Sequence, residues 1–309
     1  MAKPKRPIRM PPKVQPSVLK PIPGKVADAN PRFRPKVLPL VVGGALLYFG
    51  ATYTTMLVYK SKQDTQNDIE RREAGVEDSE LTPGNFDTST IWNKIAADYD
   101  KEIATDEFWM GIGLLRRWLI GKAKGDVLEV SAGTGRNFEH YKPDHVTSLT
   151  FTDKSPSMLE EAKSKFEEYN SNFKKAFVAF KRADVQEIGS LTTDDGKPMK
   201  FDTVIDTFGL CSCSDPVEAI LGMVNACKDS EDARILLLEH GRSHYDWLNN
   251  LLDKNADKHV SKWGCWWNRD FMSVFEDERV TRELDIEKVS RWHLGTTYYV
   301  IAKKKSKST

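Results

Sequence analysis

Short apolar runs and longer amphipathic stretches alternate along the chain from about residue 90 onward. The runs predict strands of a sheet that is buried on both faces, and they are residues 126–132, 146–153, 177–184, 201–209 and 234–241. Helical spacing is found at residues 91–103, 106–121 and 155–169. Ser155 is expected to cap the last of these helices, with Pro156 in its first turn. The alternation predicts an α/β fold with helices on both faces of a mostly parallel, Rossmann-like sheet.

The last two predicted strands form a hairpin. They cover approximately residues 288–294 and 295–305, and Gly295 turns the chain between them. The predicted sheet therefore has seven strands, of which the final one is antiparallel. The string LTPGN, rich in residues that break secondary structure, marks the start of the folded domain. We expect this domain to occupy residues 86–305.

One segment carries no charge from residue 37 to residue 59. As a helix, its 23 residues would span roughly 34 Å, slightly more than a hydrocarbon core of about 30 Å. Tyr59 at its far end suits an anchor at the membrane interface. We expect one transmembrane helix over 37–59, the alternative being a buried core helix. A charged linker over 60–85 follows it, and residues 306–309 form a C-terminal tail.

Residues 1–36 are basic and rich in proline. They hold ten Lys or Arg, one acidic residue and nine prolines. A basic leader with few acids is typical of organelle transit peptides, so we expect a mitochondrial targeting segment and arrest in the inner membrane. Residues 60–80 hold only four basic residues against seven acids. Since the more basic flank stays inside, we expect the C-terminal domain in the intermembrane space.

The net charge of +1 hides an uneven distribution. Residues 1–36 carry a net charge of +9, and the remainder carries −8. Because nucleic-acid binding needs Lys and Arg on the folded domain, the acidic body argues against a nucleic-acid partner. The four cysteines are too few and too irregularly spaced for a disulfide framework. We expect packed, reduced thiols at Cys211, Cys213, Cys227 and Cys265.

A glycine-rich turn follows the first predicted strand and is expected to open a helix. It begins at Glu129 and contains Gly133 and Gly135, which permit a tight turn and close approach of a ligand to the backbone. A dinucleotide fingerprint would need a third glycine where Phe138 stands. Asp153 ends the second predicted strand. There a carboxylate can accept hydrogen bonds from both hydroxyls of a ribose.

These strings resemble a known family. EVSAGTGRN, TDKSPSML, RAD and DTFGLCS, in this order, resemble the class I S-adenosylmethionine-dependent methyltransferases, and IAADYD resembles the segment that covers the cofactor in relatives of quinone-biosynthesis enzymes. DTFGLCS and LLEHGRSHYDWLNNLLDKNADKHVSKWGCWWNRD are similar to the fungal Oms-type methyltransferases of the mitochondrial inner membrane, which share one N-terminal span. The resemblance covers about residues 88–304. Ser131 departs from it, because the usual motif has a glycine there and a side chain could crowd the cofactor.

The resemblance implies S-adenosylmethionine as cofactor. The residues that would hold its methionine moiety are Glu129, Ser131, Ala132, Gly133, Thr134, Gly135 and Asn137. The ribose hydroxyls would bind Asp153, and the adenine would lie among Lys154, Met158, Asp184 and Val185. The sulfonium would be bordered by Thr207 and Phe208, with Tyr99 closing over the site. Simpler alternatives are a helix cap at Asp184 and plain packing at Tyr99.

A general base is needed only where the methyl acceptor must lose a proton. His240, at the end of the fifth predicted strand, is the catalytic candidate, and a histidine hydrogen-bonded to backbone is the alternative. Glu239, His240 and His244 could suggest a metal site. We expect no metal there, because the pair of histidines begins at a strand end and not on a helix.

Residues 243–275 contain a dense group of aromatic side chains, namely Tyr245, Trp247, Trp263, Trp266 and Trp267. This segment either forms a lid over an apolar acceptor or simply packs a helical insertion. The methyl acceptor would be a small molecule or a protein. The alternative function is a methyltransferase-fold assembly or stabilising factor for respiratory-chain complexes, which binds cofactor with little or no turnover.

Overall fold

The structure is a computed structural model that describes residues 43–44, 48, 50–55 and 87–305. The chain divides into two units, Met1–Asp78 and Ser79–Thr309. Among the described residues, no helix has the length and apolar character needed to cross a membrane. Most of the expected span over 37–59 lies outside the described residues, and so do the predicted targeting segment, the linker and the tail.

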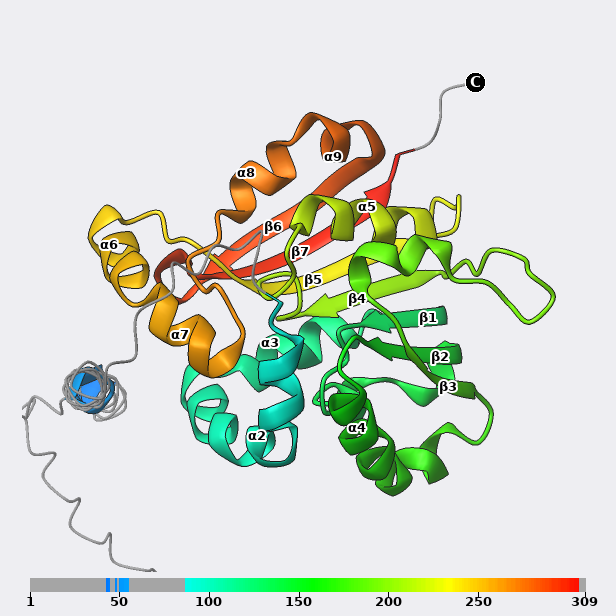
Figure 1. The fold of residues 1–309 in the computed structure, drawn as a ribbon, viewed down its shortest axis with the longest axis horizontal. Coiled ribbons are helices and arrows are strands. Elements are labelled where there is room, and N and C mark those ends of the chain that lie inside the picture. Colours follow the sequence, from blue (N-terminus) through cyan, green and yellow to red (C-terminus); the bar gives the residue numbers. More distant parts are fainter. Residues whose placement is uncertain (1–42, 45–47, 49, 56–86, 306–309) are drawn as a thin grey trace, which may run out of the picture. The chain divides into compact units, whose positions relative to one another are not determined.

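A seven-stranded sheet forms the centre of the second unit (Figure 1). Its strands are β1 (Gly125–Val130), β2 (Val146–Asp153), β3 (Phe177–Arg182), β4 (Thr203–Thr207), β5 (Arg234–His240), β6 (Leu284–Trp292) and β7 (Thr297–Lys304). Their order across the sheet is β3-β2-β1-β4-β5-β7-β6. The first five strands of this order are parallel, and β7 runs antiparallel to both neighbours. The predicted mixed sheet with an antiparallel final strand is confirmed.

Helices cover both faces of this sheet, as Figure 1 shows. They are α2 (Ser89–Met110), α3 (Ile112–Ile120), α4 (Pro156–Tyr169), α5 (Pro216–Ala226), α6 (Asp246–Lys254), α7 (Ala256–Trp263), α8 (Phe271–Glu276) and α9 (Glu278–Glu283). Successive strand residues point to opposite faces, so Val127 packs with α3 and α4 whereas Leu128 packs with α5, α8 and α9. The apolar runs of the sequence are buried because each strand has a helical layer on either side.

Two local predictions were wrong. The two helical stretches expected at 91–103 and 106–121 were separated too early. The first helix, α2, continues to Met110 because nothing before that point breaks it, and the chain turns at Gly111, where φ is +65°. The glycine-rich turn opens only the 3-10 helix Phe138–His140 and not an α-helix. Pro143 follows closely, and a proline disfavours helical backbone at the residue before it.

Other local predictions were correct. Ser155 caps α4, since its Oγ accepts a hydrogen bond from the Met158 amide at 3.1 Å, and Pro156 occupies the first turn. Gly295 closes the β6–β7 hairpin with a φ of +91°. A side chain there would collide with the ring of His244, because a Cβ would lie 2.5 Å from its Nδ1. The hairpin tip therefore packs tightly against the start of the aromatic insertion.

Candidate functional site

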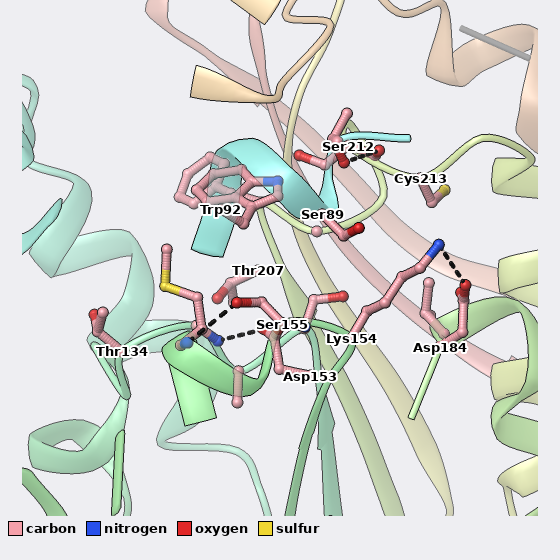
Figure 2. A pocket seen from close by; sticks show the side chains of 18 of the residues that line it. Ser89, Trp92, Thr134, Asp153, Lys154, Ser155, Asp184, Thr207, Ser212 and Cys213 are labelled. Carbon is pink, nitrogen blue, oxygen red and sulfur yellow. Dashed lines mark hydrogen bonds and ion pairs between the residues drawn. The ribbon is translucent and has the colours of Figure 1, made fainter. Parts of the chain in front are cut away.

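A pocket lies at the carboxyl ends of β1, β2 and β4, where the strand order changes direction (Figure 2). This is the place where open α/β sheets bind ligands. Its walls come from five segments, namely residues 87–99, 131–137, 153–158, 184–186 and 207–214, with Arg116 of α3 added. Segments far apart in the sequence thus converge on one cavity.

Most of the predicted site residues line this pocket. They are Tyr99, Ser131, Ala132, Gly133, Thr134, Asn137, Asp153, Lys154, Met158, Asp184, Val185, Thr207 and Phe208. Glu129, Gly135 and His240 are not among the lining residues. The structure therefore brings together the residues expected at the two ends of the ligand. It places Glu129, Gly135 and His240 outside the pocket lining.

Asp153 joins the end of β2 to the glycine-rich turn. Its Oδ2 accepts a hydrogen bond from the Gly133 amide and its Oδ1 accepts one from the Ser155 amide, both at 2.8 Å. Burial raises the pKa of Asp153 to about 6. Because an ionised carboxylate has about four acceptor sites, these amides do not exhaust its capacity to accept from a ligand. The carboxylate is thus held in one orientation at the pocket wall.

The two glycines of the turn have different roles. Gly133 has a φ of +56°, and a Cβ there would have nothing within 4 Å, so its backbone is open to a ligand. Gly135 has a φ of +78°, and a Cβ there would lie 2.1 Å from the ring of Phe138. The expectation that Gly135 contacts cofactor is not supported, because this glycine makes room for a core phenylalanine.

Glu129 is buried behind the turn. It accepts hydrogen bonds from Asn137 Nδ2 at 2.9 Å and from the Tyr141 hydroxyl. Burial raises the pKa of Glu129 to about 7. Asn137 Nδ2 also donates to Thr207 Oγ1 at 2.9 Å. Glu129 therefore positions the turn through Asn137 and does not itself line the pocket.

Ser131 has a left-handed backbone, with a φ of +50°. This is a conformation that glycine adopts without penalty, and a glycine is what the family motif has at this position. The Ser131 side chain lies over Gly209, where a Cβ would be 2.3 Å from the Ser131 Cβ. Room for the hydroxymethyl group is thus provided by the absence of a side chain at Gly209.

An ion-pair network that sequence reasoning missed ties α2 to the turn. Glu107 of α2 accepts from Arg136 at 2.6 Å and from Arg116 at 2.8 Å. Asp100 accepts from Thr134 Oγ1 at 2.6 Å and from Arg136 at 3.1 Å, and it also pairs with Lys165 of α4. Burial favours a raised pKa for Glu107, but the two arginines outweigh it and hold that pKa below its ordinary value.

Arg116 places a buried cation at the pocket wall. It donates to Asn137 Oδ1 at 3.0 Å and to Thr207 Oγ1 at 2.9 Å. Its guanidinium lies 5.0 Å from the centre of the Phe208 ring. Arg116 thereby fixes Asn137, which was predicted to hold the methionine moiety, and Thr207, which was predicted to border the sulfonium. The sequence offered no local signal for this role, since the partners are 21 and 91 residues away.

A pair of buried carboxyl groups supports the loop after β4. Asp206 Oδ2 accepts from the Leu210 amide at 2.8 Å, and Glu239 Oε2 accepts from the Cys211 amide at 3.2 Å. Burial raises the pKa of Asp206 to about 7, and burial together with the neighbouring Asp206 raises that of Glu239 well above its ordinary value. The loop that carries Phe208, whose φ is +60°, therefore rests on a carboxyl pair that retains a proton.

The end of the pocket away from the glycine-rich turn, where the adenine was expected, is polar. Lys154 Nζ lies 3.1 Å from Asp184 Oδ2, as Figure 2 shows. Asp184 also accepts from the Gln186 amide and so caps the 3-10 helix Val185–Ser190. The cap was the simpler alternative for Asp184, and here the same carboxylate both caps a helix and lines the pocket.

Tyr99 of α2 lies between two tryptophans. Its ring centre is 5.6 Å from that of Trp92 and 6.2 Å from that of Trp263. Burial raises the pKa of its hydroxyl. Tyr99 and Trp92 line the pocket, whereas no residue of 243–275 does. Tyr99 thus both packs against neighbouring rings and covers the pocket. The insertion contacts lining residues from behind, through Trp263 against Tyr99 and through Arg269, which donates to the Cys213 carbonyl at 2.6 Å.

Two tryptophans of the insertion, Trp266 and Trp267, are fixed by hydrogen bonds to backbone carbonyls. The Trp266 amide donates to the Cys211 carbonyl at 3.1 Å, and Trp267 Nε1 donates to the Leu252 carbonyl at 2.9 Å. Trp247, by contrast, is 61% exposed. All four cysteines are free, and Cys211 and Cys213 lie in the loop after β4 and not on the strand.

His240 lies behind the pocket wall. Its ring stacks on Phe208 at 4.3 Å between centres, and Phe208 stands between it and the cavity. Burial lowers the pKa of His240 to about 3. The side chain is therefore neutral at physiological pH and a weak proton acceptor. The position does not support the expectation that His240 acts directly as a catalytic base.

Comparison with known proteins agrees with this geometry. Residues 128–230 match the family model described as a methyltransferase domain. This stretch forms a methyltransferase domain. The yeast Saccharomyces cerevisiae protein named "Methyltransferase OMS1, mitochondrial" is 40% identical over 225 residues. The alignment covers 71% of this chain but only 46% of the relative, so the chain spans about half the length of the relative it matches.

Solved structures share the methyltransferase fold at low identity. The N-methyltransferase NodS from Bradyrhizobium japonicum, solved with S-adenosyl-l-homocysteine, aligns with a TM-score of 0.50 at 13% identity, covering 72% of this chain and 100% of NodS. The complex of the Haloferax volcanii Trm112 methyltransferase activator with a methyltransferase gives a TM-score of 0.50 at 14% identity, over 69% and 96%. The resemblance stated from the sequence is confirmed.

Proposed function

We propose that the pocket binds S-adenosylmethionine and that the chain transfers its methyl group to an acceptor. The observation that carries the proposal is the Asp153 carboxylate, which two backbone amides hold at the end of β2 with acceptor sites left over. The open backbone at Gly133 supports the same conclusion, because a ligand can approach it closely. The methyltransferase domain over residues 128–230 supplies the class of reaction.

The lining residues fit this ligand from end to end. The turn at Ser131–Thr134 would receive the methionine moiety, with Arg116 and Asn137 behind it. Asp153 would accept from the ribose hydroxyls, and the adenine would lie between Met158, Asp184 and Val185. Thr207 and Phe208 would border the sulfonium, and Tyr99 would cover it. When bound, the ligand supplies a methyl group that is already activated by a positively charged sulfur.

The chain's own contribution to the reaction would be alignment. Orienting two reactants accounts for roughly 7–11 kcal/mol of barrier in favourable cases. The ion pairs of Glu107 and Asp100 fix the turn against α2, and the carboxyl pair beneath residues 208–211 fixes the opposite wall. With its pKa near 3, His240 contributes little as a base. We infer that the reaction does not depend on His240 as a strong base.

Binding measurements on paired variants test the proposal. Calorimetry with S-adenosylmethionine on the full chain should show saturable binding, and Asp153→Ala should weaken it by about 1–3 kcal/mol, which is roughly 5- to 150-fold. Asp194→Ala is the matched control, because Asp194 is exposed and lies outside the pocket. No binding by the unaltered chain would refute the proposal.

The acceptor is either a small molecule or a protein, and a role in assembling respiratory-chain complexes without turnover is the competing function. The Asp153→Ala variant separates these, provided that it accumulates to normal levels in cells. If it restores respiration in a strain that lacks the protein, scaffolding explains the phenotype. If it fails while Asp194→Ala succeeds, cofactor binding is required.

We also propose that residues 37–59 anchor the chain in the mitochondrial inner membrane, with the domain in the intermembrane space. Support comes from the 23 uncharged residues, from the basic leader and from the word "mitochondrial" in the name of the yeast relative. The described residues of the segment, 43–44, 48 and 50–55, are helical.

A further inference from the structure

The large apolar side chains exposed on the domain are concentrated on one surface. Eleven large hydrophobic residues from position 87 onward are exposed, and nine of them belong to this group. They are Phe108, Trp109, Leu114, Trp118, Tyr245, Trp247, Leu251, Trp292 and Leu294, which we call the aromatic face. They come from the end of α2, from α3, from α6 and from the tip of the β6–β7 hairpin.

Contacts join these four elements into one continuous surface. Trp118 of α3 lies 6.0 Å from Trp292 of β6 between ring centres. His293 beside it hydrogen-bonds through Nε2 to the Met110 carbonyl at 2.7 Å, which ties the hairpin to the junction of α2 and α3. The Ser243 hydroxyl donates to the Leu294 carbonyl, and Figure 1 shows the hairpin end beside α6.

On α3 the exposed apolar residues follow helical spacing. Leu114 and Trp118 are 55% and 51% exposed, and they are one turn apart on a side of the helix next to the one that buries Leu115 and Leu119. Arg117 is exposed between them. This helix therefore has one apolar side in the protein core and a second apolar side, with a cation, facing outward. The α6 part of the face also contains exposed Asp246, so α3 and the hairpin carry the stronger signal.

We propose that the aromatic face lies on the surface of the lipid bilayer, a proposal that rests on the membrane anchor put forward above. Tryptophan and tyrosine are the residues enriched at membrane interfaces, and exposed leucine with arginine completes the composition of a surface-bound helix. Anionic headgroups complement Arg117.

The length of the linker favours lipid over other occupants. The 27 residues from 60 to 86 separate the uncharged segment from the described domain and extend at most about 97 Å. A domain on such a tether stays close to the membrane at high effective concentration, so weak contacts suffice for docking. The charged composition of the linker carries few apolar residues that would cover the face instead.

Docking in this way would bring the Phe208 wall of the pocket near the bilayer. Phe208 at the pocket wall stacks on His240, and His240 pairs with Thr297 of β7 next to the turn of the hairpin. His293 Nδ1 contacts Thr297 Oγ1 at 2.9 Å. A short path of packed side chains thus leads from the pocket to the aromatic face, and the acceptor class that this arrangement suits is a lipophilic molecule dissolved in the membrane.

Photo-crosslinking of the full chain in vesicles of phosphatidylcholine and phosphatidylglycerol tests the proposal. A benzophenone amino acid would replace Trp118, Leu294, Tyr48 or Phe177 in turn, with adducts identified by mass spectrometry. Phe177 is the matched control, because it is 71% exposed but lies on β3, at the edge of the sheet opposite to β6. Lipid adducts at least tenfold more abundant at positions 118 and 294 than at 177 are expected.

The four positions separate this proposal from the anchor. Adducts at Tyr48 with none above the control at 118 and 294 would overturn docking and leave the anchor standing. Absence of lipid adducts at Tyr48 would overturn both. Crosslinks from position 118 to a second copy of the chain, in place of lipid, would overturn the proposal by assigning the face to an oligomer.

Discussion

Ser131 and Gly209 are the most instructive pair at the scale of single residues. The usual motif has glycine at the first of these positions, and this chain has a serine there with a φ of +50°. The Ser131 side chain occupies the space that a side chain at position 209 would need, and this space is open because residue 209 is glycine. The two positions therefore behave as one unit, although 78 residues separate them.

Gly209→Ala should destabilise the domain. The new Cβ would lie 2.3 Å from both the Ser131 Cβ and the Asp206 Oδ1, and overpacking of this kind costs about 1–3 kcal/mol. Gly113→Ala is the control, because a Cβ on this α3 glycine meets nothing within 4 Å. Thermal unfolding should show a lower Tm for the first variant and an unchanged or slightly higher one for the second. Ser131→Gly added to Gly209→Ala should restore part of the loss, and no recovery would contradict the pairing.

At the scale of elements, α2 acts as the cover of the pocket. Its N-terminal half supplies Trp92 and Tyr99, and its C-terminal half supplies Glu107, which pairs with two arginines. The pairing with Arg116 is buried, since the side chains of Arg116 and Glu107 are 5% and 10% exposed. Removing one partner of a buried pair leaves an uncompensated charge. The position of α2 is therefore sensitive to a single carboxylate.

Glu107→Gln should loosen α2 and weaken cofactor binding. Breaking a buried ion pair costs about 3–5 kcal/mol, part of which would appear as faster amide hydrogen exchange in α2 and the glycine-rich turn. Glu102→Gln is the control on the same helix, because Glu102 is half exposed and its pair with Lys262 spans 3.7 Å. An exposed pair contributes about 0–1 kcal/mol. Equal exchange rates in both variants would show that the network does not hold the helix.

The elements differ in how well the sequence predicted them. The strands follow from short apolar runs, and the α4 cap follows from adjacent Ser155 and Pro156, because both signals are local. The break at Gly111 was missed, since glycine is tolerated in a helix until its backbone turns left-handed. The ion pairs of α2 were missed because their partners, such as Asp100 and Arg136, are 36 residues apart and form no motif.

The site shows the same division between local and tertiary information. Asp153 and Gly133 could be predicted, because each sits at a strand end that the apolar pattern locates. His240 was placed correctly at the end of β5, but only the tertiary structure shows that Phe208 stands between its ring and the cavity. Arg116 was missed because an arginine in an amphipathic helix, here next to the exposed Arg117, resembles a surface residue in the sequence.

At the scale of the whole molecule, we expect residues 37–59 to span the inner membrane and the domain to lie in the intermembrane space. Protease added to intact mitochondria should leave the domain uncut, and rupture of the outer membrane should expose it to cleavage. The charge bias across residues 37–59 is the physical reason, because the basic leader favours the inner side. A matrix protein and an intermembrane-space protein serve as controls in the same digest. A domain that stays protected after rupture would contradict the predicted sidedness.

The first described residues of the domain lie at its candidate binding site. Asp87, Thr88 and Ser89 are the first described residues of the domain, and all three line the pocket, with the Thr88 hydroxyl donating to the Ser212 carbonyl at 3.1 Å. The last strand, β7, runs antiparallel to β5. It therefore ends, at Lys304, at the edge of the sheet opposite to the carboxyl ends of the parallel strands, where the pocket lies. A truncation that removes Asp87–Ser89 should therefore lower ligand affinity, whereas a fusion placed after Lys304 should leave it unchanged.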